Sequence, residues 1–289
     1  MFIIQLFGGI GNQMFQLALY KNFELSNKKV LIDDLSFKPS WKIEQIKINK
    51  IFPNISYNAA DKEIIELLSD FRDSRLHRLR RKYLFKKNSH IREPKFTFNY
   101  FIYLLEGDYY LEGFWQSEKY FKHISDEIIK LFLFPDIKGE KNIELSKKII
   151  SENSVSIHVR KGEDYKRILN EGICNKNYYE RSIELISNKV NNPKFYIFSD
   201  NVIWCKENLS FIDAKIIDWN PKDGPLCYLD MQLMSLCKHN IIANSSYSWW
   251  GAWLNKNPDK IVVGPKRWFN SSDPKFDTRD LIPESWYKL

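Results

Sequence analysis

The chain has 289 residues, 44% of them hydrophobic and 28% charged, a composition that excludes a fibrous or an intrinsically disordered protein. Its formal net charge is +8. No stretch approaches the roughly 20 uninterrupted apolar residues that a membrane-spanning helix needs, and no signal peptide is recognisable. We therefore expect a cytoplasmic protein of one large or two smaller domains.

The cysteines and histidines carry no metal-binding pattern. The four cysteines, Cys174, Cys205, Cys227 and Cys237, are far apart and form no CxxC pair, and the five histidines form no HExxH pair. We expect free thiols, no metal site built from side chains and no cofactor.

Much of the positive charge lies in a basic run between residues 71 and 88. Its members are Arg72, Arg75, Arg78, Arg80, Arg81, Lys82, Lys86 and Lys87. A solvated helix face explains such a run, and so does an anionic partner, either a membrane surface or a phosphate-bearing substrate. Nucleic acid is disfavoured because no known nucleic-acid-binding signature surrounds the run.

The first part of the chain reads as a strand over residues 2–6, a glycine loop over 8–12, a helix over 13–25 and a strand over 29–32. This order is the unit of a doubly wound parallel sheet. Residues 59–87 are expected to be helical and charged, and an aromatic segment follows over 96–121.

A second series begins after a helix over residues 143–150. It comprises strands over 155–159, 194–198, 215–217 and 240–243, helices over 178–190 and 229–238, and a further helix opened by residues 244–248. This second succession predicts two α/β domains of similar size, residues 1–150 and 151–289, with a cleft between them.

The glycine segment over residues 8–16 lies between the first strand and the first helix. Glycines allow close backbone approach, and a helix start presents N–H groups to polar or anionic atoms, so Gly11 and Asn12 are candidates for donor binding. A dinucleotide fingerprint is disfavoured because Met14 occupies the place of its third glycine. A structural turn without a ligand is the alternative.

The segment over residues 158–165 follows a predicted strand, and ligands bind at the carboxyl end of such strands. Arg160 and Lys161 suit phosphate oxygens, and either Glu163 or Asp164 could serve as a general base. Structural salt bridges are the competing explanation.

Two further segments carry small polar residues. Ser199 and Asp200 follow the next strand and could hold ribose or base groups, or form only an Asn/Asp turn. Ser245 and Ser246 open a helix, where hydroxyls and backbone N–H groups together suit a diphosphate. The tryptophans of that helix can equally be core residues.

Six stretches come in the order found in one enzyme family: GGIGNQMFQLALY at 8–20, GFWQSEKYF at 113–121, HVRKGEDY at 158–165, NYYERSI at 177–183, FSDN at 198–201 and DMQLMSLCKHNIIANSSYSWWGAWLN at 230–255. On these, the chain resembles glycosyltransferase family 11, the α-1,2-fucosyltransferases, and specifically their bacterial branch. The resemblance implies an α/β protein of GT-B type, with two Rossmann-like domains facing across a cleft. In it, residues 1–150 would form the acceptor-side domain and residues 151–289 the domain that binds GDP-fucose. It also implies an inverting, metal-independent transfer of fucose from GDP-fucose to a galactose hydroxyl.

The resemblance assigns roles to particular residues. Arg160 would contact the β-phosphate of GDP, Asp230 would grip guanine, and Ser245 and Ser246 would lie on the phosphate side. The family commonly has a second arginine where this chain has Lys161, and this chain carries an extra Glu163 before Asp164. The acceptor hydroxyl must lose a proton, so His158, Glu163 and Asp164 are the catalytic candidates beside Arg160.

Three other functions remain open. The 15% aromatic content also suits a carbohydrate-binding protein without catalysis. A fucosyltransferase of different linkage shares the segment around Arg160, and a nicotinamide oxidoreductase is weakened by the missing third glycine. The expected partners are GDP-fucose and a galactose-terminated, lipid-linked acceptor in O-antigen or other surface-glycan synthesis, with a peripheral contact at the inner face of the membrane.

Overall fold

The computed structural model describes residues 1–36, 48–71, 86–162 and 169–289. The chain divides into two compact units: unit 1 holds residues 1–133 and 279–281, and unit 2 holds residues 134–278 and 282–289. The sequence placed the boundary at residue 150. The helix α5 (Glu140–Ser151) packs against α8 (Leu229–Leu236) and therefore belongs to unit 2.

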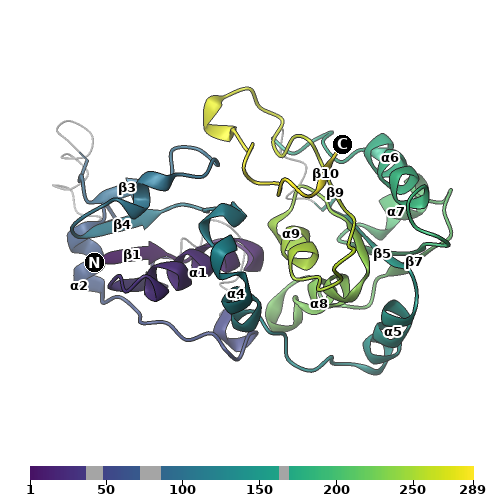
Figure 1. The fold of residues 1–289 in the computed structure, drawn as a ribbon, viewed down its shortest axis with the longest axis horizontal. Helices are drawn as coiled ribbons and strands as arrows, with labels where there is room; N and C mark the ends of the chain where they lie inside the picture. The colour runs from purple at the N-terminus through teal and green to yellow at the C-terminus, as the bar shows by residue number, and fades with distance from the viewer. Residues whose placement is uncertain (37–47, 72–85, 163–168) are drawn as a thin grey trace. The chain divides into compact units, whose positions relative to one another are not determined.

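Unit 1 is built on a four-stranded parallel sheet of order β2-β1-β4-β3 (Figure 1). Its elements are β1 (Phe2–Gln5), α1 (Ile10–Leu25), β2 (Val30–Asp33), η2 (Ile48–Lys50), α2 (Lys62–Leu68), β3 (His90–Arg92), η3 (Tyr100–Tyr103), β4 (Tyr109–Glu112), η4 (Glu118–Tyr120), η5 (Lys122–Ile124) and α4 (Ser125–Leu131). Every residue of β1 is buried, which suits its central place between β2 and β4.

Unit 2 is built on a six-stranded sheet of order β10-β9-β8-β5-β6-β7, in which every described pairing is parallel. Besides α5 and α8 its elements are β5 (Ser154–Val159), α6 (Lys176–Ser187), β6 (Lys194–Ser199), α7 (Val202–Asn208), β7 (Ala214–Ile217), η7 (Gly224–Leu226), β8 (His239–Ile241), α9 (Ser246–Trp253), β9 (Val262–Gly264), η8 (Pro274–Phe276) and β10 (Tyr287–Lys288). This strand order is that of the Rossmann fold.

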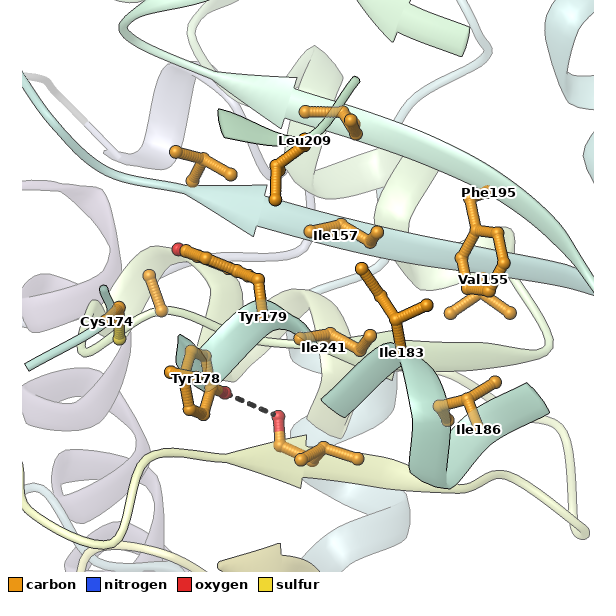
Figure 2. Close-up of a cluster of buried hydrophobic side chains, with 14 of the residues drawn as sticks. Val155, Ile157, Cys174, Tyr178, Tyr179, Ile183, Ile186, Phe195, Leu209 and Ile241 are labelled. Carbon is orange, nitrogen blue, oxygen red and sulfur yellow. Dashed lines mark hydrogen bonds between the residues drawn. The ribbon is translucent and has the colours of Figure 1, made fainter. Parts of the chain in front are cut away.

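The core of unit 2 lies between the sheet and α6, and Figure 2 shows this cluster. Ile157 of β5 and Tyr179 of α6 are fully buried there, beside Ile183 and Ile186. The hydroxyl of Tyr178 donates to the carbonyl oxygen of Ile242 at 2.6 Å, so its polar atom is satisfied inside the core. Tyr178 therefore links α6 to the residue that follows β8.

Two local predictions were wrong. Ile10, Gly11 and Asn12 lie in α1 and not in a loop, because Gly8, at a φ of 82°, and Gly9 complete the turn alone. Within the described part of the predicted helical region 59–87, α2 ends before Ser69, and the backbone N–H of Asp70 donates to His90 Nδ1 at 2.9 Å instead of continuing that helix. Residues 72–85 of this region lie outside the described residues.

The other predicted elements are present with shifted ends, and β3, β4, α4, α7, β9 and β10 were not predicted. All four cysteines are free thiols, as predicted, and the structure also buries all four. Among the described residues, no helix combines the length and the apolar character that a membrane span requires. The basic run over 72–85 lies outside the described residues, and only Lys86 and Lys87 fall within them.

Candidate active site

The sheet of unit 2 has a point where the direction of chain winding reverses. From β5 the chain proceeds through β6 to β7 on one side, and then returns to place β8, β9 and β10 on the other. In such sheets ligands bind outside the carboxyl ends of the two strands that flank the reversal. Those ends are the segments after β5 and after β8, where Arg160, Lys161, Ser245 and Ser246 lie.

His158 lies near the end of β5, and the segment after β5 carries Arg160 and Lys161. The side chain of His158 is buried and its ring lies 5.7 Å from the ring of Tyr247, centroid to centroid. Its backbone carbonyl accepts a hydrogen bond of 2.9 Å from the hydroxyl of Tyr179. The ammonium of Lys161 lies 5.0 Å over the ring of Trp204. The core beneath thus fixes where this cationic segment leaves the sheet.

Asp200 ties the segments after β5 and β6 together. Its Oδ1 accepts the backbone N–H of Lys161 at 2.6 Å, and the side-chain amide of Asn201 donates to the Lys161 carbonyl at 3.3 Å. Ser199 is buried, and its hydroxyl accepts the backbone N–H of Asn201 at 2.9 Å. The structure thus brings Lys161 and Asp200 together, and a contact of Ser199 or Asp200 with ribose stays a prediction.

Asp230, in the first turn of α8, is only 5% exposed, and its carboxylate accepts hydrogen bonds from two side chains. The side-chain amide of Asn220 donates to Oδ1 at 2.8 Å, and Lys222 Nζ donates to Oδ2 at 2.6 Å. Asn142 of α5 then donates to Asn220 at 2.8 Å. A buried carboxylate needs this kind of pairing, and the network fixes its direction.

Lys222 and Tyr247 are site residues that the sequence analysis missed. Lys222 lies on the segment that follows β7, so its position after a parallel strand was the available signal. The hydroxyl of Tyr247 donates to the Cys227 carbonyl at 2.6 Å and accepts the Met231 N–H at 2.8 Å. Tyr247 therefore joins the start of α8 to the start of α9.

The segment after β8 leads directly into α9, with Ser245 at the N-cap. The Ser245 side chain makes no capping hydrogen bond, although its carbonyl accepts the Trp249 N–H at 3.0 Å. Helix starts present N–H groups and a positive dipole to anions. Behind this start, Trp249 and Trp250 are fully buried, so these tryptophans are core residues that anchor α9.

The electrostatics of the site disfavour a charged histidine. Burial, and then the positive charges of Arg160 and Lys222, lower the pKa of His158 to about 3. Burial likewise lowers the pKa of Lys161 from its ordinary value. The imidazole of His158 is therefore neutral at pH 7, where it can offer a hydrogen bond but has little tendency to take up a proton.

The remaining predicted residues lie elsewhere. Gly11 and Asn12 belong to unit 1, where the side-chain amide of Gln116 donates to Asn12 Oδ1 at 2.8 Å. Glu163 and Asp164 lie outside the described residues. Within the described part of the chain, no group of three or more His, Cys, Asp or Glu residues could hold a metal ion.

Comparison with known proteins identifies the family of the chain. Glycosyl transferase family 11 matches the chain over residues 1–288. An alpha-1,2-colitosyltransferase of Escherichia coli is 30% identical, covering 99% of this chain and 98% of that protein. The O-antigen biosynthesis glycosyltransferase WbnK of Escherichia coli is 32% identical, covering 98% of each. The crystal structure of NodZ alpha-1,6-fucosyltransferase soaked with GDP-fucose has a TM-score of 0.52 at 13% identity, covering 87% of this chain and 92% of NodZ.

The two parallel α/β units and the likeness to NodZ define a fold of GT-B type, as the sequence predicted. At 13% identity that likeness is one of fold alone. Because the family match spans almost the whole chain, the protein belongs to glycosyltransferase family 11.

The low pKa of His158 predicts an acid-sensitive fold. Well above pH 6.5, His158 is neutral in both the folded and the unfolded chain. As the pH falls, the unfolded chain takes up a proton at its ordinary pKa and the folded chain does not. Between pH 7 and pH 5 this should lower the free energy of unfolding by about 2 kcal/mol, a loss that His158→Gln removes. Urea unfolding at both pH values measures the difference.

Comparing the wild type with His158→Gln isolates the contribution of His158 to the loss of stability between pH 7 and pH 5. His239, whose pKa burial also lowers, remains in both and cancels. Equal losses of stability in the wild type and in His158→Gln would contradict the assignment.

Proposed function

We propose that the protein transfers L-fucose from GDP-fucose to a galactose hydroxyl with inversion, forming an α-1,2 linkage, during synthesis of a surface glycan. The observation that carries this proposal is the gathering of cationic groups and helix N–H groups at the winding reversal of unit 2. Arg160 and Lys161 leave β5 there, and α9 begins there after β8.

The chemistry explains why such a site suits this reaction. Breaking the bond between fucose and GDP leaves negative charge on the diphosphate. Arg160, Lys161 and the start of α9 would stabilise this charge, and preorganised donors of this kind lower a barrier without a metal ion. Ser245 and Ser246 would add hydroxyl donors to the same oxygens. A carbohydrate-binding protein without catalysis releases no leaving group, so it does not need groups that stabilise the negative charge of a diphosphate.

A colitosyl donor is the second candidate, because a relative similar along the whole chain is named for colitose. Colitose differs from fucose in lacking the hydroxyl on carbon 3. A site built to hydrogen-bond that hydroxyl rejects a sugar without it, whereas a site that merely encloses the sugar discriminates weakly. The ratio of kcat/KM for the two GDP-sugars therefore decides between the donors.

Transfer to a panel of galactose-terminated acceptors, followed by linkage analysis of the product, tests the proposal. We expect an α-1,2-fucosyl product whose rate of formation is nearly unchanged by EDTA. Arg160→Ala should lower kcat/KM on the order of 100-fold, since it removes a charge that opposes the charge of the leaving group.

Arg181→Ala is the matched control, because Arg181 is an exposed arginine of α6 in the same unit. That variant should keep wild-type activity. Strong inhibition by EDTA, an active Arg160→Ala protein or a product of another linkage would each overturn the corresponding part of the proposal.

We further propose that Asp230 selects guanine. A carboxylate has about four acceptor positions, and Asn220 and Lys222 occupy two of them. The others can accept N1–H and the exocyclic amine of guanine, a donor pair that adenine does not offer. Asp230→Asn should weaken GDP binding more than ADP binding, and calorimetry with both nucleotides measures this. An unchanged preference for GDP would leave Asp230 a structural residue.

The basic run over residues 72–87 supports a proposed peripheral contact with the inner face of the membrane, where a lipid-linked acceptor would be met. Each Lys or Arg near an anionic surface contributes about 1 kcal/mol, screened over roughly 8 Å at physiological salt. Changing Arg78, Arg80, Arg81 and Lys82 to glutamine should reduce sedimentation with phosphatidylserine vesicles but spare transfer to a soluble acceptor. Wild-type protein that ignores such vesicles at low salt would rule the contact out.

A further inference from the structure

The two partners of Asp230 differ in how firmly they fix its carboxylate. Lys222 carries its ammonium on a flexible stem, its side chain is 39% exposed, and an ammonium acts as a point charge that favours no single direction. Asn220 is buried, and its planar amide donates along one line to Oδ1 at 2.8 Å. The direction in which Asp230 points its remaining acceptor positions therefore depends on Asn220.

The amide of Asn220 could in principle be turned over, because the oxygen and the nitrogen of an asparagine have nearly the same size. Turned over, Asn220 would place its oxygen against the Asp230 carboxylate, and two acceptors repel each other. Asn142 of α5 prevents this, since its Nδ2 donates to Asn220 Oδ1 at 2.8 Å. Asn142 is itself buried, so no solvent competes for this hydrogen bond.

The orientation of Asn142 is set by two groups that each have a single role. The indole N–H of Trp219 can only donate, and it donates to Asn142 Oδ1 at 2.8 Å. The backbone carbonyl of Lys138 can only accept, and it accepts from Asn142 Nδ2 at 2.9 Å. A directed chain of hydrogen bonds therefore runs from the Trp219 indole through both asparagines and ends on the Asp230 carboxylate.

Trp219, two residues beyond β7, is held at the head of this chain by cations from two elements. Nζ of Lys141 in α5 lies 5.7 Å from the centroid of the Trp219 ring, and Nζ of Lys215 in β7 lies 5.6 Å from it. Ammonium groups at this distance are attracted to an indole. The indole N–H therefore has a fixed place relative to both α5 and β7.

A chain of buried amides is a costly way to join α5 to α8. Polar groups in the interior must all find partners merely to offset their desolvation, and packed apolar residues of similar volume often stabilise a protein at least as well. What a fully satisfied polar chain adds is a fixed direction for its donors and acceptors. The structure therefore provides more than stability where this chain ends, at Asp230.

We propose that Trp219, Asn142 and Asn220 are positioning residues that set the base specificity of the site through Asp230. The inference rests on the proposed role of Asp230 in selecting guanine. Two acceptor positions can meet N1–H and the exocyclic amine together only when the carboxylate points along both lines. A carboxylate that is free to turn gives up one of these hydrogen bonds, and guanine then loses its advantage over hypoxanthine, which has N1–H but no exocyclic amine.

Asn142→Leu tests the proposal, because leucine has the same number and branching of side-chain atoms but neither donor nor acceptor. Calorimetry with GDP and IDP, the hypoxanthine nucleotide, measures the contribution of the exocyclic amine. We expect the wild type to prefer GDP about tenfold, the value of one hydrogen bond to a charged group, and the variant to lose at least about threefold of that preference. Trp219→Phe should lower the preference less, because Lys138 still orients Asn142.

The kinetics of fucosyl transfer give a second measurement. The guanine base takes no part in the bond that breaks, so it binds the donor equally in the ground state and in the transition state. Asn142→Leu should therefore raise the KM for GDP-fucose and leave kcat near the wild-type value. A variant that is merely less well folded would instead lose kcat and melting temperature together.

Asn255→Leu is the matched control, because Asn255 is a buried asparagine of the same unit that also donates to a second asparagine. Its Nδ2 lies 2.8 Å from Asn240 Oδ1, and its other described hydrogen bonds join Lys238 and Asn257. This variant should lose melting temperature as Asn142→Leu does. It should nevertheless keep both the wild-type preference for GDP over IDP and the wild-type KM.

The outcomes separate this inference from the proposed role of Asp230. An unchanged preference for GDP over ADP in Asp230→Asn would defeat that role. If Asp230→Asn loses this preference while Asn142→Leu and Trp219→Phe keep the wild-type ratio of GDP to IDP affinity, the positioning chain is overturned alone. An equal fall of the ratio in Asn255→Leu would overturn it as well. Should Asn142→Leu fail to fold, Trp219→Phe decides by the same ratio.

Discussion

The parallel pairing of β5 with β6 on one side and β8 on the other is the constraint on which the candidate active site depends. In this register Val159 lies opposite Ser199, and Ile157 lies opposite Ile241. The segments that begin at Arg160, Asp200 and Ile242 therefore leave the sheet at the same edge. Arg160 and Ser246 are 86 positions apart in the chain (246 − 160), and the sheet register brings their two segments to the same edge.

Hydrogen bonds from buried polar side chains then fix the segments that the sheet only brings near one another. Asp200 holds the backbone at Lys161, and Tyr247 links the starts of α8 and α9. Asp230 is held by Asn220 and Lys222. Each of these polar groups is costly to bury alone, so the segment that completes its hydrogen bonds has few alternative positions. The site is thereby preorganised by interactions outside the regular elements.

The parts of the fold predicted from the sequence are those in which local pattern and burial agree. Strand β6 contains a continuous apolar run, β5 alternates Val155, Ile157 and Val159 with polar residues, and α6 shows helical spacing. These elements were therefore expected close to their true ends. The short strands β3, β9 and β10 have two or three residues each, too few for a periodic signal. They form because a neighbouring strand offers a partner, which is tertiary information.

The same distinction applies to the candidate site. Arg160 and Lys161 were found because they directly follow a recognisable strand, and His158 because it lies near the end of that strand. Lys222 lies five residues beyond the short strand β7 and is paired with Asp230.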